Sequence, residues 1–128
     1  MKIRVLMVLL LVPIALTACI GQERLHFEGS SGSWEVNYDL LVSEKDSSEQ
    51  GTVKIKYVGE DETPEQIDYE IKGGSGKSSG NNTALDDGFL EASGSNCSGC
   101  AVTQEDDEFD VTIDWAGKTD NFTLKSED

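Results

Sequence analysis

The alternation that decides the fold is clearest in Trp34-Glu35-Val36-Asn37-Tyr38-Asp39-Leu40-Leu41-Val42. Apolar residues recur at every second position of this stretch, and polar residues fill most positions between them. Successive side chains of a β-strand point to opposite faces of the sheet, so this pattern is typical of a half-buried strand. We therefore predict a strand over residues 34–42.

The same alternation recurs along the rest of the chain. It predicts further strands over residues 53–57, 67–72, 109–115 and 119–125, and weaker ones over residues 25–28, 89–93 and 101–104. Ala116-Gly117-Lys118 separates two of these segments. It is typical of a hairpin turn in which Gly117 takes a positive φ.

Three patches rich in glycine and serine interrupt the alternating segments. They are Gly29–Ser33, Gly73–Gly80 and Ser93–Gly99, and we predict them as loops.

No segment carries a sustained apolar repeat at helical spacing, so helix is expected to be minor at most. Short strands with frequent turn signals predict an all-β domain. The favoured form is a small antiparallel β-sandwich of roughly immunoglobulin-like build, and a small β-barrel is the alternative. Trp34 and Trp115 are expected to be its large core residues.

The N-terminal segment predicts export and lipidation. Lys2 and Arg4 precede an apolar run, and small residues then lead into Cys19, as in a secretory signal peptide that ends at a lipobox. The apolar run Val5–Ile20 has 16 residues and contains Pro13, whereas about 20 are needed to cross a bilayer. We predict a lipoprotein signal peptide over residues 1–18, a lipidated Cys19 within a short tether over residues 19–24, and one β domain over residues 25–128.

The charge of the chain limits its partners. The formal charge is −15, and loss of Lys2 and Arg4 with the signal peptide would make it −17. Such a field repels nucleic acid and favours a protein partner with a basic surface.

The composition also limits the chemistry. His26 is the only histidine, and both methionines, Met1 and Met7, lie in the predicted signal peptide. Multi-histidine zinc sites and methionine-rich copper sites therefore cannot form within one mature chain. A small domain with short loops also offers little cleft for a substrate, so we predict that the protein is not an enzyme.

Cys97-Ser98-Gly99-Cys100 is the sharpest local motif. In an oxidising compartment this pair predicts a structural disulfide. Thiol exchange and a zinc or copper site completed by an outside ligand stay open as alternatives.

Glu105-Asp106-Asp107-Glu108, followed by Asp110, is the densest acidic run. We interpret it as a solvated turn, and no cofactor is predicted. A weak Ca²⁺ site formed by Glu105, Asp106, Asp107 and Asp110 is the alternative, because Ca²⁺ is bound by carboxylate oxygens.

The stretches His26–Gly29, Trp34–Tyr38, Gly73–Gly80, Cys97–Ala101 and Trp115–Thr119 together resemble a group of small, uncharacterised lipoproteins of Gram-positive, low-GC bacteria. The resemblance implies a β domain anchored to the outer face of the cytoplasmic membrane, and it implies no catalytic residue. We expect a non-catalytic binding or structural module at the cell surface. The alternatives are a divalent-cation binder and a thiol–disulfide partner acting through Cys97 and Cys100.

Overall fold

The computed structural model describes residues 22–73 and 76–126. The predicted signal peptide and Cys19 lie outside these residues. The described chain is all-β, as predicted. Its strands are β1 (Gln22–Ser30), β2 (Trp34–Ser43), β3 (Ser48–Tyr57), β4 (Gln66–Gly73), β5 (Gly76–Ala84), β6 (Phe89–Ser98), β7 (Phe109–Trp115) and β8 (Lys118–Ser126).

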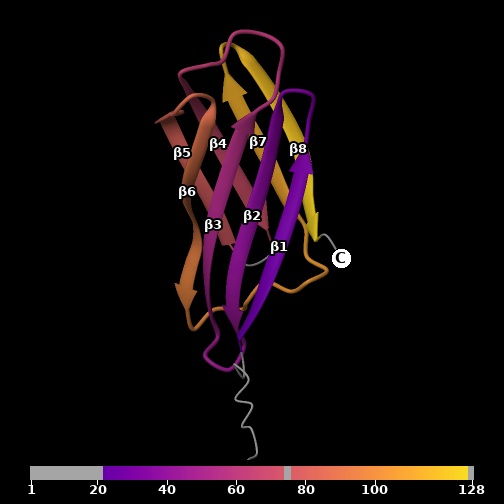
Figure 1. Cartoon of the computed structure of the whole chain (residues 1–128). Coiled ribbons are helices and arrows are strands. Elements are labelled where there is room, and N and C mark those ends of the chain that lie inside the picture. Colours follow the sequence, from indigo (N-terminus) through magenta and orange to yellow (C-terminus); the bar gives the residue numbers. More distant parts are fainter. Residues whose placement is uncertain (1–21, 74–75, 127–128) are drawn as a thin grey trace, which may run out of the picture.

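The eight strands form one antiparallel sheet in the order β5-β4-β7-β8-β1-β2-β3-β6. The sheet curls until its two outermost strands, β5 and β6, approach each other (Figure 1). There the Ser78 hydroxyl donates a hydrogen bond to the Ser93 carbonyl oxygen at 3.1 Å. The small antiparallel all-β prediction is therefore confirmed, and the near-closure of the sheet corresponds to its barrel alternative.

The barrel has two ends, which we name from Figure 1. The lower end holds the first described residue, Gln22, which pairs with Ser43, together with the 44–47 turn and the 99–108 loop. The upper end holds the β1–β2, β5–β6 and β7–β8 turns and the β3–β4 loop. Hydrogen bonds join these segments, and the Ser31 hydroxyl also donates one of 2.6 Å to Asp120 near the start of β8.

The apolar positions of the alternating segments form one continuous core between these ends. Trp34 and Trp115 are both buried, as predicted, and their rings meet edge to face with centroids 5.3 Å apart. Phe27 and Phe109 pack in the same way at 5.0 Å. Edge-to-face pairs add to the stability that burial of the rings already provides.

The loop predictions for the three glycine- and serine-rich patches were wrong over much of their length. Residues 76–80 lie in β5, residues 93–98 extend β6, and residues 29–30 end β1. The physical reason is space for aromatic rings. A Cβ at Gly94 would lie 2.4 Å from Tyr38 Cε1, and one at Gly80 would lie 2.7 Å from Tyr69 Cε1. These glycines are therefore strand residues that make room for core side chains.

Two further boundaries differ from the predictions. Residues 101–104 are not a strand; they belong to the loop between β6 and β7. Strand β1 begins at Gln22, inside the predicted tether, because Gln22, Glu23 and Arg24 all pair with β2.

The hairpin turn between β7 and β8 is confirmed. Ala116 and Gly117 have φ values of 47° and 78°, as a two-residue turn between twisted strands requires.

Among residues 22–73 and 76–126, no helix has the length and apolar character that a membrane crossing would need.

Candidate functional site

Two shallow grooves adjoin at the upper end of the barrel. The sheet groove, of about 440 Å³, lies beside the starts of β4 and β8 and is lined by Gln66, Ile67, Asp68, Asn82 and residues 114–119. The loop groove, of about 330 Å³, lies beside the β3–β4 loop and is lined by residues 61–65 with Trp115, Ala116 and Lys118. Since Trp115, Ala116 and Lys118 line both grooves, the two meet at the β7–β8 turn.

Two carboxylates on neighbouring strands line the sheet groove. Asp68 on β4 and Asp114 on β7 are direct cross-strand partners. Asp68 accepts a hydrogen bond of 2.6 Å from the Asn82 backbone N–H, and Asp114 accepts one of 2.5 Å from the Thr119 hydroxyl. Like charges at directly opposed positions destabilise a sheet. The negative charges of Asp68 and Asp114 therefore do not stabilise the fold.

An irregularity in the sheet shapes the same groove. The pairing between β4 and β5 shifts register between Ile67 and Tyr69, and Asn82 has a φ of 49°. Asparagine adopts this left-handed region more readily than most residues do. The bend brings the Asn82 N–H to the Asp68 carboxylate and so fixes its orientation.

Among residues 22–73 and 76–126, Lys118 is the one ammonium group that lines either groove. Its Nζ lies 2.9 Å from the Asp61 carboxylate and 6.0 Å from the centre of the Trp115 ring. The hydrogen bond to Asp61 is the main reason why the pKa of Lys118 is raised. The tight turn makes Lys118 the cross-strand partner of Trp115, which places the ammonium group near the ring.

The predicted disulfide between Cys97 and Cys100 is present at the lower end. Cys97 pairs with Glu49 across β6 and β3, and the Cys100 N–H donates to the Ser47 carbonyl oxygen at 2.9 Å. The disulfide thus holds the start of the 99–108 loop against the β2–β3 turn.

Glu49 is a buried carboxylate that the alternation did not reveal, because it precedes the segment predicted as a strand. Its side chain lies beneath the 99–108 loop and is 2% exposed. It accepts hydrogen bonds from the Thr103 N–H at 2.7 Å and the Thr103 hydroxyl at 3.2 Å. These bonds compensate the carboxylate for the water that it loses on burial.

Tyr38 is a second buried polar side chain. Its Oη accepts a hydrogen bond of 2.7 Å from the Ser95 N–H, and burial raises the pKa of its phenol.

The acidic run that the sequence singled out lies in the lower-end loop and at the start of β7. Asp107 accepts a hydrogen bond of 2.8 Å from the Gln104 N–H, and Glu108 lies 4.0 Å from Lys125. Asp110 pairs across the sheet with Lys72. Within the part of the chain that the structure describes, no three histidine, cysteine, aspartate or glutamate side chains are grouped so that they could hold a metal ion.

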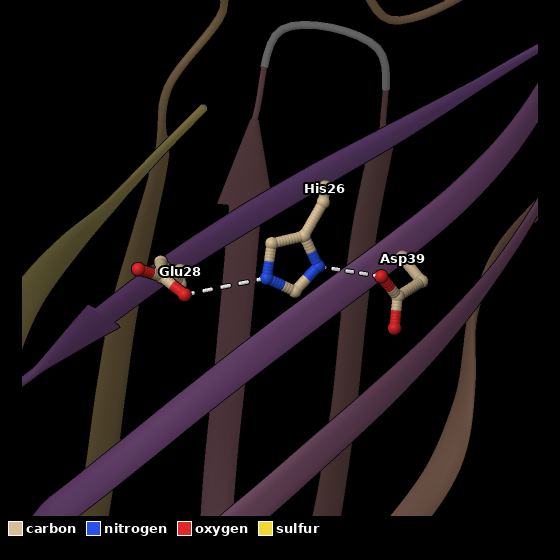
Figure 2. Close-up of polar contacts among 3 residues, drawn as sticks. All are labelled: His26, Glu28 and Asp39. Carbon is tan, nitrogen blue, oxygen red and sulfur yellow. Dashed lines mark hydrogen bonds and ion pairs between the residues drawn. The ribbon is translucent and has the colours of Figure 1, made fainter. Parts of the chain in front are cut away.

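The only histidine lies on the outer face of β1 and β2. Figure 2 shows the His26 ring between two carboxylates, with Nδ1 2.5 Å from Asp39 and Nε2 3.3 Å from Glu28. The hydrogen bond to Asp39 is the main reason why the pKa of His26 is raised, and partial burial opposes it. A carboxylate only accepts hydrogen bonds, so both contacts are satisfied together when the imidazole carries two protons.

Comparison of the chain with protein-family models, with curated protein sequences and with solved structures finds no significant match.

Proposed function

We propose that this chain is a lipoprotein held on the outer face of the cytoplasmic membrane through a lipid on Cys19. Its β domain is a non-catalytic binding module that presents the two grooves away from the membrane. The partner is a protein with a basic surface.

The observation that carries this proposal is the position of the N-terminal side of the domain. Gln22 follows Cys19 by three residues and lies at the lower end of the barrel, whereas both grooves lie at the upper end. Strand β1 has 9 residues, which at about 3.4 Å per residue span roughly 30 Å. A lipid on Cys19 would therefore leave the grooves directed outward.

The charge of the grooves supports a basic partner. Within the part of the chain that the structure describes, their linings contain five carboxylates, from Asp61, Glu62, Glu65, Asp68 and Asp114, and the ammonium group of Lys118. The whole chain has the same sign, with a formal charge of −15. Attraction between opposite charges would speed the encounter with a basic protein.

Mass spectrometry and membrane fractionation test the anchor in a bacterial host that processes lipoproteins. We expect wild-type protein in the membrane fraction, with a mass that begins at Cys19 and includes a diacylglyceryl group. The Cys19→Ala variant should lose this mass and leave the membrane or keep its signal peptide. Cys97→Ala is the matched control, because it removes a cysteine outside the predicted lipobox and should leave lipidation unchanged. A wild-type mass equal to the unmodified chain from Cys19 onward would disprove the proposal.

A further inference from the structure

The charge of the chain is distributed unevenly between the loops and the barrel wall. Four segments that connect strands hold twelve carboxylates and one lysine; they are residues 44–47, 58–65, 85–88 and 99–108. On β3 and β6, by contrast, the exposed charged side chains are Lys54, Lys56 and Glu91. Repulsion between like charges keeps the loops of two copies apart, whereas the small positive excess on β3 and β6 lets another acidic molecule approach there.

The same part of the wall carries exposed apolar side chains. Among residues 22–73 and 76–126, Val58 and Phe89 are the large apolar side chains that stay exposed, at 43% and 40%. Phe89 pairs with Lys56 across β6 and β3, and Val58 follows Lys56 by two residues. Residues two apart along a strand point to the same face, so all three lie on the outside of the barrel. Aromatic side chains are enriched where proteins meet.

The ammonium groups on this part of the wall lack ion pairs within the described chain. Four lysines on β4, β5 and β8 do form ion pairs with carboxylates there, namely Lys72, Lys77, Lys118 and Lys125. Among residues 22–73 and 76–126, Lys54 and Lys56 form none, although Lys54 lies opposite Glu91 in the sheet. Both ammonium groups are therefore available to a partner molecule.

We propose that this surface is the contact between two copies of the chain. We name it the β3–β6 face; it consists of Lys54, Lys56, Val58, Phe89 and Glu91. In the dimer, a twofold axis runs parallel to the strands between β3 and β6, so that β3 of one copy faces β6 of the other. Lys54 of each copy lies at the height of Glu91 of the other copy, and Lys56 lies at the height of the Phe89 ring. One ion pair and one cation–π contact are thus each formed twice.

The register of the sheet favours a second copy as the occupant. Lys54 opposes Glu91, and Lys56 opposes Phe89, on neighbouring strands. A rotation by 180° about an axis between these strands exchanges the strands and leaves the heights of their residues unchanged. Each ammonium group then meets a carboxylate or an aromatic ring. An axis through β3 itself would place Lys54 against Lys54, so the complementarity selects the axis between β3 and β6.

The rotation keeps both copies pointing in the same direction. Both lower ends lie on one side of the dimer, and both sets of grooves lie on the other (Figure 1). Two chains anchored in one membrane require this arrangement, so the orientation of the dimer rests on the proposed function, whereas the contact itself goes beyond it. Two sets of grooves at one height would also hold a partner with two basic segments more tightly than one set does.

Sedimentation equilibrium of the full chain tests the dimer. The chain is purified in a nonionic detergent that is matched in density to the solvent, with about 0.15 M NaCl. We expect a monomer–dimer equilibrium in wild type. Lys54→Glu replaces both ion pairs with repulsions and should weaken the dimer by about ten-fold or more. Phe89→Ala removes the ring from both copies and should weaken it by about five-fold or more.

Two matched variants separate this contact from general repulsion between acidic chains. Lys125→Glu makes the same change of charge on β8 and should weaken the dimer by less than about three-fold. Lys54→Glu/Glu91→Lys exchanges the two charges and should restore the affinity to within about three-fold of wild type.

Cross-linking then locates the contact. A carbodiimide condenses an amine with a carboxylate that lies against it, so it should join Lys54 of a ¹⁴N-labelled copy to Glu91 of a ¹⁵N-labelled copy. The mixed label distinguishes this link from one within a single chain.

Three results would overturn the inference. They are a wild-type chain that stays monomeric at every concentration measured, equal weakening by Lys54→Glu and Lys125→Glu, and no recovery in the charge-exchanged variant. Each of them can be obtained whether or not Cys19 carries a lipid, which the mass of the chain reports separately. Failure of the dimer is therefore distinguishable from failure of the proposed membrane anchor.

Discussion

At the lower end of the barrel, Glu49 is buried and accepts two hydrogen bonds from Thr103, whereas at the upper end Asp114 is exposed and faces Asp68 across the sheet. The lower-end carboxylate ties the 99–108 loop to β3. The upper-end carboxylates repel each other along the wall of an open groove. Residues of one chemical type thus contribute to folding at one end and oppose it at the other.

In a chain of charge −15, the two ends separate carboxylates that stabilise the fold from carboxylates that do not. A buried carboxylate with matched donors needs no external ligand, because the protein supplies its hydrogen bonds. A directly opposed pair of surface carboxylates would be stabilised by a cation, and the fold does not provide that cation. Substitutions at the two ends should therefore change the free energy of unfolding by different amounts.

The largest expected effect is at the lower end. Glu49→Ala removes the carboxylate that accepts hydrogen bonds from the Thr103 N–H and hydroxyl, and it should lower the free energy of unfolding by about 3 kcal/mol. Glu49→Gln keeps one acceptor oxygen and should lose roughly half as much. At the upper end, Asp61→Ala removes an exposed ion pair and should leave the free energy of unfolding nearly unchanged. Urea unfolding measures all three; similar losses for Glu49→Ala and Asp61→Ala would remove the contrast.

The disulfide gives the second largest effect. The bridge joins residues only three apart in sequence, so it restricts a short loop of the unfolded chain. By loop-closure entropy, Cys97→Ser/Cys100→Ser should lower stability by about 2 kcal/mol at most, and the barrel should stay folded. Amide exchange should rise in the 99–108 loop and not around the upper-end grooves. Equal increases at both ends would show that the disulfide does not act locally.

The sequence predicted the fold where burial is one-sided. The segments over residues 34–42 and 109–115 alternate regularly because one face of each packs on the core, and both are strands. The prediction failed for β5, where Ser78 is buried and Gly80 makes room for the Tyr69 ring. A strand whose inward positions hold small residues has no apolar alternation, so it resembles a loop in the sequence.

The candidate site was less accessible to sequence reasoning. The Cys97–Cys100 disulfide could be predicted because the two cysteines are close together in the sequence. The opposition of Asp68 and Asp114 depends on the register of β4 and β7, which are not consecutive in the chain, and the burial of Glu49 depends on a loop that folds back over β3. Neither leaves a local pattern in the sequence.

The upper-end acidic pair predicts an opposite change of smaller size. Asp114→Asn keeps an acceptor for the Thr119 hydroxyl and removes the repulsion with Asp68, so stability should rise by about 0.5 kcal/mol. Asp110→Asn is the control on the same strand. Asp110 faces Lys72 across the sheet, so this change should lower stability by about 0.3 kcal/mol. Both are read from urea midpoints at pH 7 and low salt; changes of the same sign would mean that net charge, and not the local pairing, decides the effect.

The smallest effect is expected at His26, on the outer face of β1 and β2. Here the fold itself supplies a cation to two exposed carboxylates, so His26 shows whether such carboxylates then contribute to stability. Asp39 and Glu28 hold the imidazolium, and its pKa is raised in the folded state. A raised pKa gives a stabilisation that is fully present below the unfolded value of about 6.5 and is lost as the pH rises through the folded value. Below about pH 4 it is lost again, because the carboxylates become protonated.

The comparison of His26→Gln with wild type at pH 5.5 and pH 9 measures this contribution. The side chain of His26 is 35% exposed, so solvent screens the ion pairs, and we expect the variant to lose about 0.3 kcal/mol more stability at pH 5.5 than at pH 9. An NMR titration of the imidazole should give a pKa above 6.5 in wild type and a lower one in Asp39→Asn. A greater loss at pH 9 would reverse the sign and contradict the assignment. An equal loss of stability at both pH values would mean that His26 acts through packing. Asp39 has a cation from the chain and Asp114 is paired with another carboxylate, and this contrast would then have no energetic basis.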